Sequence, residues 1–171
     1  MKKPFKHTID IESLKKLLSY DKDTGKFTWT KDAHFKVRGK EAGYINRKFG
    51  YIRIGVLNKV YQAHRLAWIY HYGVNPEQQV DHINGDKTDN RIKNLRLATT
   101  AQNQMNCKAH CDNSTGFKGV TYRKGLKKPY RAAVQTCGKM IHVGYFSTPK
   151  EASIAYYLKA REIFGEFASQ G

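Results

Sequence analysis

A carboxylate, an imidazole and several side-chain amides are concentrated in residues 80–106 of this 171-residue chain. Asp81 and His82 are adjacent at the end of a short apolar run, and Asn94 and Asn103 follow them. An imidazole that titrates near neutral pH can take a proton from water, and Asp and Asn oxygens can hold a hard divalent cation. Hydrolysis of a phosphodiester needs both functions, because water must be deprotonated and charge on the phosphate must be neutralised.

The pattern around these residues predicts a strand, a polar loop, a second strand and a helix. The first apolar run ends at His82, a loop rich in Asn, Asp and Gly follows, and Leu95–Ala98 forms the second run. Thr99 or Thr100 then opens the helix. Neighbouring residues of a regular strand point to opposite sides, so Asp81 and His82 can serve one phosphate only if the strand end is twisted.

The spacing of these residues is similar to that of the HNH nucleases, in their phage and homing-endonuclease branch. Asn94 lies thirteen residues and Asn103 twenty-two residues after Asp81. The resemblance covers about 27 residues. The matching residues are Asp81-His82-Ile83-Asn84-Gly85, Asn90-Arg91, Asn94-Leu95, Thr99 and Asn103.

This resemblance implies a role for each residue. His82 is expected to be the general base, Asp81 and Asn103 the metal ligands, and Asn94 the residue that holds the loop and orients His82. The third letter of the motif is Asn103 and not His, which gives an H-N-N signature. An oxygen ligand at that place favours Mg²⁺ or Mn²⁺ over Zn²⁺.

A simpler interpretation of the same stretch is that Asp, Asn and Gly only build a tight polar loop, with His82 an ordinary partly buried residue. The joint match in residue type and spacing favours the nuclease. Upstream of the motif, Arg65 could contact a phosphate, because its guanidinium matches phosphate oxygens. His64 and His71 are seven residues apart and are interpreted as packing residues of one helix face.

The composition favours a nucleic-acid partner. Lys and Arg number 31 against 14 Asp and Glu, a formal net charge of +17. An excess of this size predicts attraction to a polyanion, and 12% aromatic and 40% hydrophobic residues permit real cores. We find no apolar run near the roughly 20 residues that span a bilayer and no signal-peptide core. We therefore expect no membrane association and a cytoplasmic location, in a phage-infected bacterial host.

Three cysteines, an odd number, argue against a disulfide framework and for a reducing compartment. A zinc site would have to combine Cys107, Cys111 and Cys137 with His110. These residues lack the paired spacing of structural zinc ligands, so no structural zinc is expected.

Residues 1–106 are predicted to form the nuclease domain, of α+β class, with an N-terminal β-meander and a ββα-metal (His-Me finger) core at 80–106. Apolar spacing predicts a short helix near Asp10–Ser19. Alternating residues predict a strand at Lys26–Thr30 and an antiparallel meander from Gly43 to Tyr61. A further helix is predicted at Ala63–Tyr72, ended by Gly73.

The chain after the motif predicts a second domain. Residues 107–116 are polar and irregular and are taken as a linker, and 117–171 as a small three-stranded antiparallel sheet packed on one helix. Thr148, Pro149 and Glu151 form a strong helix start. The expected strands are Phe117–Arg123, Tyr130–Thr136 and Lys139–Phe146.

The order of these strands and the helix resembles the ethylene-response-factor (AP-two) DNA-binding domain, over about 50 residues. In that family the sheet lies in the DNA major groove with the helix behind it. Alternation places Ala132 and Val134 on the helix side and Arg131 and Gln135 on the other. The family's DNA-contacting positions fall on Lys118, Thr121, Arg123, Arg131, Ala133, Gln135, Met140 and His142. Phosphates are expected to contact Lys124, Lys127, Lys128 and Lys139.

The sequence therefore predicts a metal-dependent, homing-type HNH endonuclease of phage origin that acts on double-stranded DNA. One active site per chain suits a monomer that nicks, although a dimer could break both strands. The main alternative is a sequence-specific DNA-binding regulator whose HNH unit is a non-catalytic relic. An RNA-binding protein is a third possibility, but the second domain suits the B-form major groove better.

Overall fold

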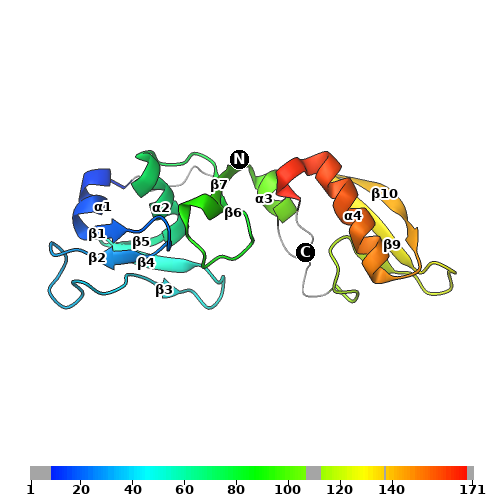
Figure 1. The fold of residues 1–171 in the computed structure, drawn as a ribbon, viewed down its shortest axis with the longest axis horizontal. Helices are drawn as coiled ribbons and strands as arrows, with labels where there is room; N and C mark the ends of the chain where they lie inside the picture. The colour runs from blue at the N-terminus through cyan, green and yellow to red at the C-terminus, as the bar shows by residue number, and fades with distance from the viewer. Residues whose placement is uncertain (1–8, 107–112, 137, 169–171) are drawn as a thin grey trace. The chain divides into compact units, whose positions relative to one another are not determined.

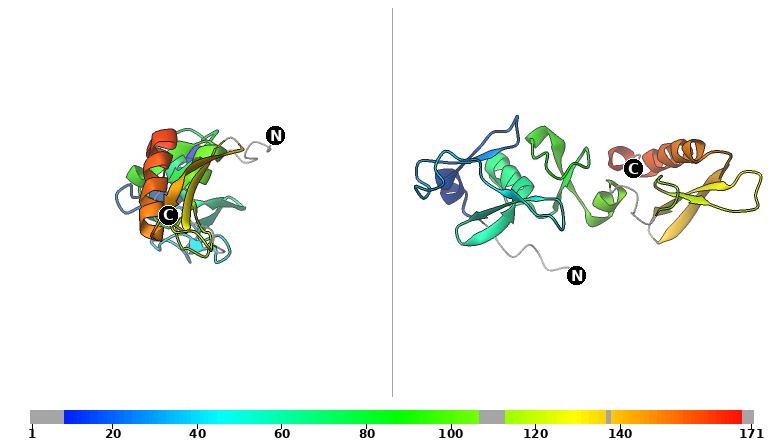
Figure 2. Two further views of the ribbon diagram at one scale, coloured as in Figure 1. Left: turned by 90° about the vertical axis from the view of Figure 1, so that its right-hand side faces the viewer. Right: turned by 90° about the horizontal axis from the view of Figure 1, so that it is seen from below.

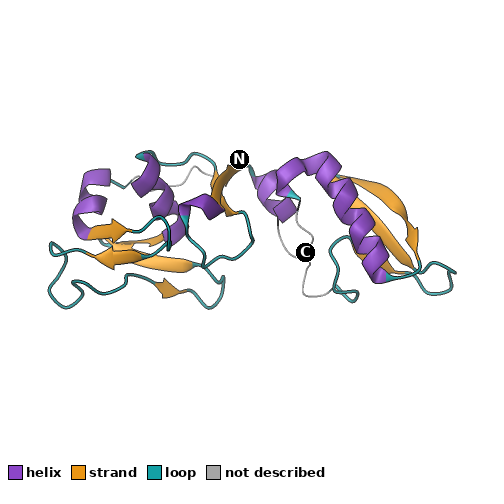
Figure 3. Cartoon of the chain, in the orientation of Figure 1, coloured by secondary structure: helices purple, strands orange, loops and turns teal. Residues whose placement is uncertain are grey.

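The computed structural model describes residues 9–106, 113–136 and 138–168 of the chain. Its contacts divide the chain into two compact units, Met1–Thr99 and Thr100–Gly171. Both units combine helices with small antiparallel sheets, so the predicted mixed α+β class is confirmed (Figure 3).

The division into two units falls at Thr99, inside the segment that the sequence assigned to one domain. The limits predicted from sequence, 1–106 and 117–171 joined by a linker, stay a prediction. Within that linker, residues 107–112 lie outside the described residues. Cys107, His110, Cys111 and Cys137, the residues considered for zinc, lie outside them too.

In the first unit every strand pairs antiparallel with its neighbours (Figure 1). The strands form a β1–β2 pair, a β3–β4–β5 sheet and a β6–β7 pair. The predicted meander is thus confirmed as the β3–β4–β5 sheet. The order is α1 (Ile11–Leu17), β1 (Leu18–Tyr20), β2 (Phe27–Trp29), β3 (Tyr44–Ile45), β4 (Ile52–Val56), β5 (Lys59–Gln62), α2 (Ala63–Tyr72), β6 (Gln79–His82), η1 (Ile92–Asn94) and β7 (Leu95–Ala98).

Helix α1 is shorter than its apolar spacing predicted. Asp10 caps it, with its carboxylate accepting the Ser13 amide at 2.8 Å. The helix ends at Leu17, and Leu18 takes extended dihedral angles and starts strand β1. Leu18 is fully buried in that strand. Apolar spacing identified it as a core residue but could not distinguish a helix end from a strand start.

Helix α2 has the predicted bounds and carries one face of the first core. It ends at Gly73, whose φ of 71° is left-handed. Its buried face includes Leu66 and Ile69, and it also includes His64. The largest fully buried apolar side chains of this core are Leu14, Leu18, Phe27, Ile54 and Leu66.

In the second unit α4 covers one face of a three-stranded antiparallel sheet in the order β10–β9–β8 (Figures 1 and 2). This arrangement of three strands and one helix agrees with the sequence prediction. Its elements are α3 (Thr100–Asn106), β8 (Val120–Tyr122), β9 (Tyr130–Thr136), β10 (Lys139–Phe146), α4 (Pro149–Phe164) and η2 (Gly165–Phe167). Its buried core consists of Val120, Ala132, Val134, Ala152, Tyr156 and Ala160.

The start of α4 carries the predicted capping box. The Thr148 hydroxyl accepts the Glu151 amide at 3.2 Å, and the Glu151 carboxylate accepts the Thr148 amide at 3.4 Å. Pro149 occupies the first helical position, where no amide is needed. Neither α4 nor any other helix in the described part of the chain is long and apolar enough to cross a bilayer.

Candidate active site

Asp81 and His82 stand at the end of β6, in the hairpin that β6 forms with β7. Asp81 pairs with Arg96 across the hairpin, and His82 pairs with Leu95. Although neighbouring strand residues point to opposite sides, both side chains are buried, with 6% of Asp81 and 4% of His82 exposed. The Asp81 carboxylate accepts a hydrogen bond from Arg96 Nε at 3.0 Å, which forms a largely buried ion pair.

The loop between these strands is held together by Asn94. Its Oδ1 accepts the Asn84 amide at 3.0 Å, and its Nδ2 donates to Asn84 Oδ1 at 3.0 Å and to the Asp89 carbonyl at 2.8 Å. A second brace lies beside it, because the Asp89 carboxylate accepts Arg91 Nε at 2.7 Å. The hydrogen bonds from Arg91 lower the pKa of Asp89 to about 2, so this carboxylate stays ionised. Asn94 is thus placed to hold the loop, as the resemblance implies.

The amide that contacts the imidazole belongs to Asn90, a motif residue to which the resemblance gave no role, and not to Asn94. His82 Nε2 lies 3.1 Å from Asn90 Oδ1, and only 2% of Asn90 is exposed. Asn90 Nδ2 donates to the Thr88 carbonyl at 3.3 Å, which fixes Oδ1 as the atom that faces the ring. His82 Nε2 must therefore be the protonated nitrogen, and Nδ1 carries the lone pair.

Asn90 is held in place by a turn almost seventy residues earlier in the chain. The Tyr20 hydroxyl donates to the Asn90 carbonyl at 2.7 Å, and burial raises the pKa of Tyr20, so this donor stays protonated. The Ile92 amide donates to the Lys22 carbonyl at 3.1 Å. Gly25 also lies against the loop, since a Cβ built on it would come within 2.5 Å of the Asn90 carbonyl carbon. The β1–β2 turn thus supports the loop.

The His82 ring also packs against two other rings. The centroid of His64 lies 4.9 Å away, edge-on, and that of Tyr51 lies 6.0 Å away. His64 and Tyr51 are themselves 5.1 Å apart. Nδ1 of His64 is buried, and the described residues offer it no hydrogen-bond partner. His64 is therefore part of the site, while His71 at the end of the same helix is exposed.

Burial sets the charge of both histidines. It lowers the pKa of His82, against smaller opposing effects of the Asn90 contact and of Asp81, Asp86 and Asp89. Burial lowers the pKa of His64 even further. Both rings are therefore neutral near pH 7. A neutral His82 with its lone pair on Nδ1 is the form that can accept a proton.

The residues that the resemblance assigns to a metal are Asp81 and Asn103. Asn103 lies in α3, which belongs to the second unit. Carboxylate and amide oxygens are the donors that hard cations prefer, and a carboxylate has about four acceptor directions, so the contact of Asp81 with Arg96 does not conflict with this chemistry. The described residues contain no group of three or more His, Cys, Asp or Glu placed to hold a metal. Few protein ligands suit Mg²⁺, which takes its remaining ligands from water and phosphate.

The side chains assigned to DNA in the second unit gather on the face of the sheet that points away from α4. Thr121 lies opposite Arg131 across the strands, and Gln135 and His142 are exposed. Arg131 extends across β10, with its Nε 3.4 Å from His142 Nδ1 and its Nη2 3.3 Å from the sulfur of Met140. These residues form a basic and polar face.

The other residues assigned to nucleic acid have different surroundings. Arg123 and Lys139 are exposed. Lys118 Nζ donates to the Met105 carbonyl of α3 at 2.5 Å. The Arg65 guanidinium donates to the Pro76 carbonyl at 2.9 Å and to the Gln78 carbonyl at 3.3 Å, so it supports the segment that leads into β6. A phosphate contact by any of these residues stays a prediction.

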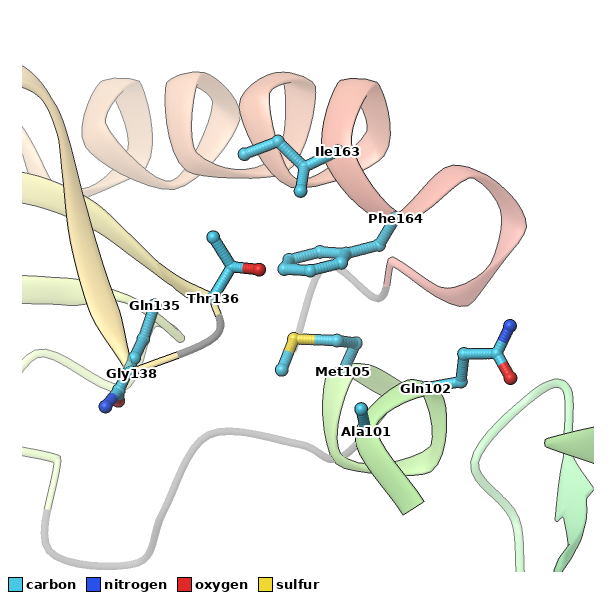
Figure 4. Close-up of a pocket in the computed structure, with 8 residues that line it drawn as sticks. All are labelled: Ala101, Gln102, Met105, Gln135, Thr136, Gly138, Ile163 and Phe164. Carbon is cyan, nitrogen blue, oxygen red and sulfur yellow. The ribbon is translucent and has the colours of Figure 1, made fainter. Parts of the chain in front are cut away.

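A cavity of about 640 Å³ lies within the second unit, between α3 and the end of α4 (Figure 4). Met105 faces Phe164 across it, and Ile163 closes one side. The lining is mainly apolar, and it includes none of the proposed catalytic residues.

Comparisons with known proteins agree with the motif. A family model described as HNH endonuclease matches residues 61–105. The chain is 36% identical to an uncharacterized HNH endonuclease, L560, of Acanthamoeba polyphaga mimivirus. The alignment spans 110 residues, which are 63% of this chain and 56% of that protein. It is 31% identical to Protein 3.8 of Escherichia phage T7. That alignment spans 111 residues, which are 64% of this chain and 90% of that protein. No solved structure gives a significant match.

The close approach of Gly25 to the active-site loop gives a test of this architecture. Gly25→Ala would place a methyl group 2.4 Å from the Arg91 amide nitrogen, so the turn or the loop must shift. Gly39→Ala is the matched control, because its φ of 71° resembles the 74° of Gly25 but its Cβ meets nothing within 4 Å among the described residues. We expect both variants to lose about 1 kcal/mol of unfolding free energy, because alanine disfavours a left-handed backbone. Gly25→Ala should lose about 1–3 kcal/mol more, because its methyl group overlaps the loop. Thermal unfolding measures the difference, and equal melting temperatures would contradict the packing.

Proposed function

We propose that the chain is a metal-dependent, homing-type enzyme that hydrolyses phosphodiester bonds of double-stranded DNA, on the basis that residues 61–105 match the HNH endonuclease family. The observation that carries the proposal is the state of His82. It is buried and neutral, and Asn90 fixes its proton on Nε2. A neutral imidazole with a fixed tautomer and a lone pair on Nδ1 suits a general base.

His82 then has a defined task. Its Nδ1 accepts a proton from the attacking water, and Asn90 Oδ1 stabilises the imidazolium that forms, through the hydrogen bond from Nε2. General-base help of this kind contributes about 10²- to 10⁴-fold to a rate. The contacts with His64 and Tyr51 restrict rotation of the ring, so the lone pair keeps one direction.

Asp81 and Asn103 are the proposed ligands of Mg²⁺ or Mn²⁺. A bound divalent cation supplies charge stabilisation at the phosphate and at the departing 3′ oxygen. Asp81 has a second partner in Arg96, whose positive charge keeps the buried carboxylate compatible with its surroundings. This ion pair orients Asp81 at the strand end.

The second unit is proposed to hold duplex DNA through its exposed sheet face, as in the ethylene-response-factor fold that it resembles. The cluster of Arg131, His142 and Gln135 supports this role. Arg and Gln side chains on a β-surface can read guanine and adenine edges in the major groove. Exposed Lys139 and Arg123 add attraction to phosphates, which raises affinity more than specificity.

A DNA-binding regulator with a non-catalytic HNH unit is the second candidate function. The ion pair of Asp81 with Arg96 favours it, because this arrangement satisfies the carboxylate without a metal. In such a protein DNA binding would persist and cleavage would be absent. The two functions therefore differ in whether the protein cleaves DNA and whether that cleavage needs His82.

The first test is cleavage of supercoiled plasmid with Mg²⁺. Wild type should nick or linearise it, EDTA should stop the reaction, and His82→Ala should lower the rate by about 10²-fold or more, because the general base is lost. His71→Ala is the control, since it removes an exposed histidine of α2. Absence of metal-dependent cleavage by wild type over many DNA sequences would favour the regulator. Undiminished cleavage by His82→Ala would identify a different base or a contaminant.

A second test concerns Asn90. Asn90→Ala removes the acceptor of the Nε2 proton, so His82 can adopt either tautomer and its imidazolium is less stabilised. We expect kcat to fall by about 10-fold or more, as for loss of one to two kcal/mol of hydrogen bonding to a charged group, with KM little changed. Steady-state cleavage over a range of DNA concentrations measures both constants. An equal change in KM and none in kcat would show that Asn90 acts in DNA binding instead.

A third test concerns the second unit. Arg131→Ala should weaken binding to duplex DNA in a gel-shift assay, because it removes the central cation of the exposed sheet face. The dependence of cleavage on Mg²⁺ should not change. Arg161→Ala on α4 is the matched control, because it removes the same charge from the helix side. Equal affinity of the two variants would exclude this docking face.

A further inference from the structure

The first unit carries a strongly basic hairpin that none of the proposed roles uses. Residues 42–60, which include β3 and β4, contain four Lys and Arg and no Asp or Glu. Over the whole chain there is about one carboxylate for every two cations. No acidic residue of this segment therefore offsets its positive charge, which is typical of a surface that meets a polyanion.

The tip of this hairpin exposes an aromatic ring between cations. Phe49 is 48% exposed, and its ring lies 5.3 Å from Lys48 Nζ and 5.9 Å from the Arg53 guanidinium carbon. Tyr44 and Ile45 of β3 are exposed beside it, and Tyr44 lies opposite Arg53 in the register. Basic side chains interleaved with exposed aromatic rings can bind phosphates and contact base edges at the same time.

The backbone around Phe49 is held in one conformation. The Asn46 side chain accepts the Phe49 amide at 3.1 Å, and the Asn46 carbonyl accepts the Gly50 amide at 2.7 Å. Gly50 supplies the left-handed φ of 76° that the turn requires. A preorganised exposed tip loses less entropy when a ligand covers it.

A lysine of the active-site loop fastens this tip next to His82. Lys87 Nζ donates to the Phe49 carbonyl at 3.0 Å and lies 4.9 Å above the Tyr51 ring. The Tyr51 ring is in turn 6.0 Å from that of His82. Phosphates of one DNA strand follow one another at about 3.4 Å along the helix axis. A strand that presents a phosphate to His82 can therefore reach the hairpin within a few nucleotides.

We propose that the hairpin clamp, defined as Arg47, Lys48, Phe49, Arg53 and Lys87, binds the DNA strand beside the scissile phosphate. Its cations neutralise flanking phosphates, and Phe49 makes an apolar contact with a base edge in the groove. The position of the clamp relative to the cut rests on the proposed nuclease function. Its binding of duplex DNA does not, because charge, exposure and preorganisation carry that part.

Binding is measured on the full chain carrying His82→Ala, with a random-sequence 30-base-pair duplex as the probe, so no cleavage is needed. Arg47→Gln with Lys48→Gln should weaken binding and lower the slope of log K against log salt by about 2, because each lost phosphate contact removes about 0.9. Lys26→Gln is the matched control, since Glu41 already pairs with Lys26 at 2.8 Å. An unchanged slope in the double variant would overturn the proposal.

The role of Phe49 is tested separately. Phe49→Ala should reduce affinity about 10-fold or more, because the buried contact of an apolar side chain with a base edge is lost. Phe35→Ala, which removes another exposed ring of the first unit, should leave it unchanged. Replacement of Phe49 by p-benzoylphenylalanine should give a photo-crosslink to the duplex DNA. No crosslink, or a crosslink to duplex RNA alone, would overturn the proposal.

The binding of DNA by the clamp and the position of the clamp beside the cut can fail independently. If wild type cleaves DNA, the crosslinked nucleotide should lie within a few positions of the mapped cut, and a distant crosslink would overturn the placement of the clamp. If wild type does not cleave, the proposed nuclease fails, while the salt slope and the crosslink still decide whether the hairpin binds DNA.

Discussion

The contact between Asn90 and His82 is the interaction on which the site depends. It decides which ring nitrogen holds the proton, and so which one can act as a base. The loop that contains Asn90 has no regular structure to fix it apart from one 3-10 turn. Tyr20 and the Gly25 turn therefore supply the missing restraint from the other end of the unit. The N-terminal hairpin thereby supports the candidate site, although none of its side chains takes part in the proposed chemistry.

Burial keeps both histidines of the candidate site neutral at the cost of desolvating polar groups. The same burial that keeps His82 and His64 neutral also surrounds the Asp81 carboxylate, which is 6% exposed. A buried carboxylate without a partner costs several kcal/mol, and Arg96 on the neighbouring strand provides that partner. Removing Arg96 would leave an uncompensated charge, so the β6–β7 hairpin and its ion pair form one structural requirement.

Sequence reasoning worked where the signal is local. Thr148 and Pro149 marked the start of α4 and Gly73 marked the end of α2, because caps depend on a few adjacent residues. The apolar run likewise predicted that the strand before the loop ends at His82. Motif spacing did not find the contact of Asn90 with His82 or the approach of Gly25, because both depend on how distant segments pack. The irregularity of β10 between His142 and Gly144 was also missed, although the extra residue shifts the alternation, with Val143 and Gly144 both partly buried.

The position of Asn103 changes how the two units are understood. The family match runs from 61 to 105 and so crosses the boundary at Thr99. Helix α3 is tied to the second unit, where Lys118 Nζ binds the Met105 carbonyl at 2.5 Å. Lys118 is also a residue assigned to DNA by resemblance. Lys118 thus binds the carbonyl end of the helix that carries the proposed ligand Asn103.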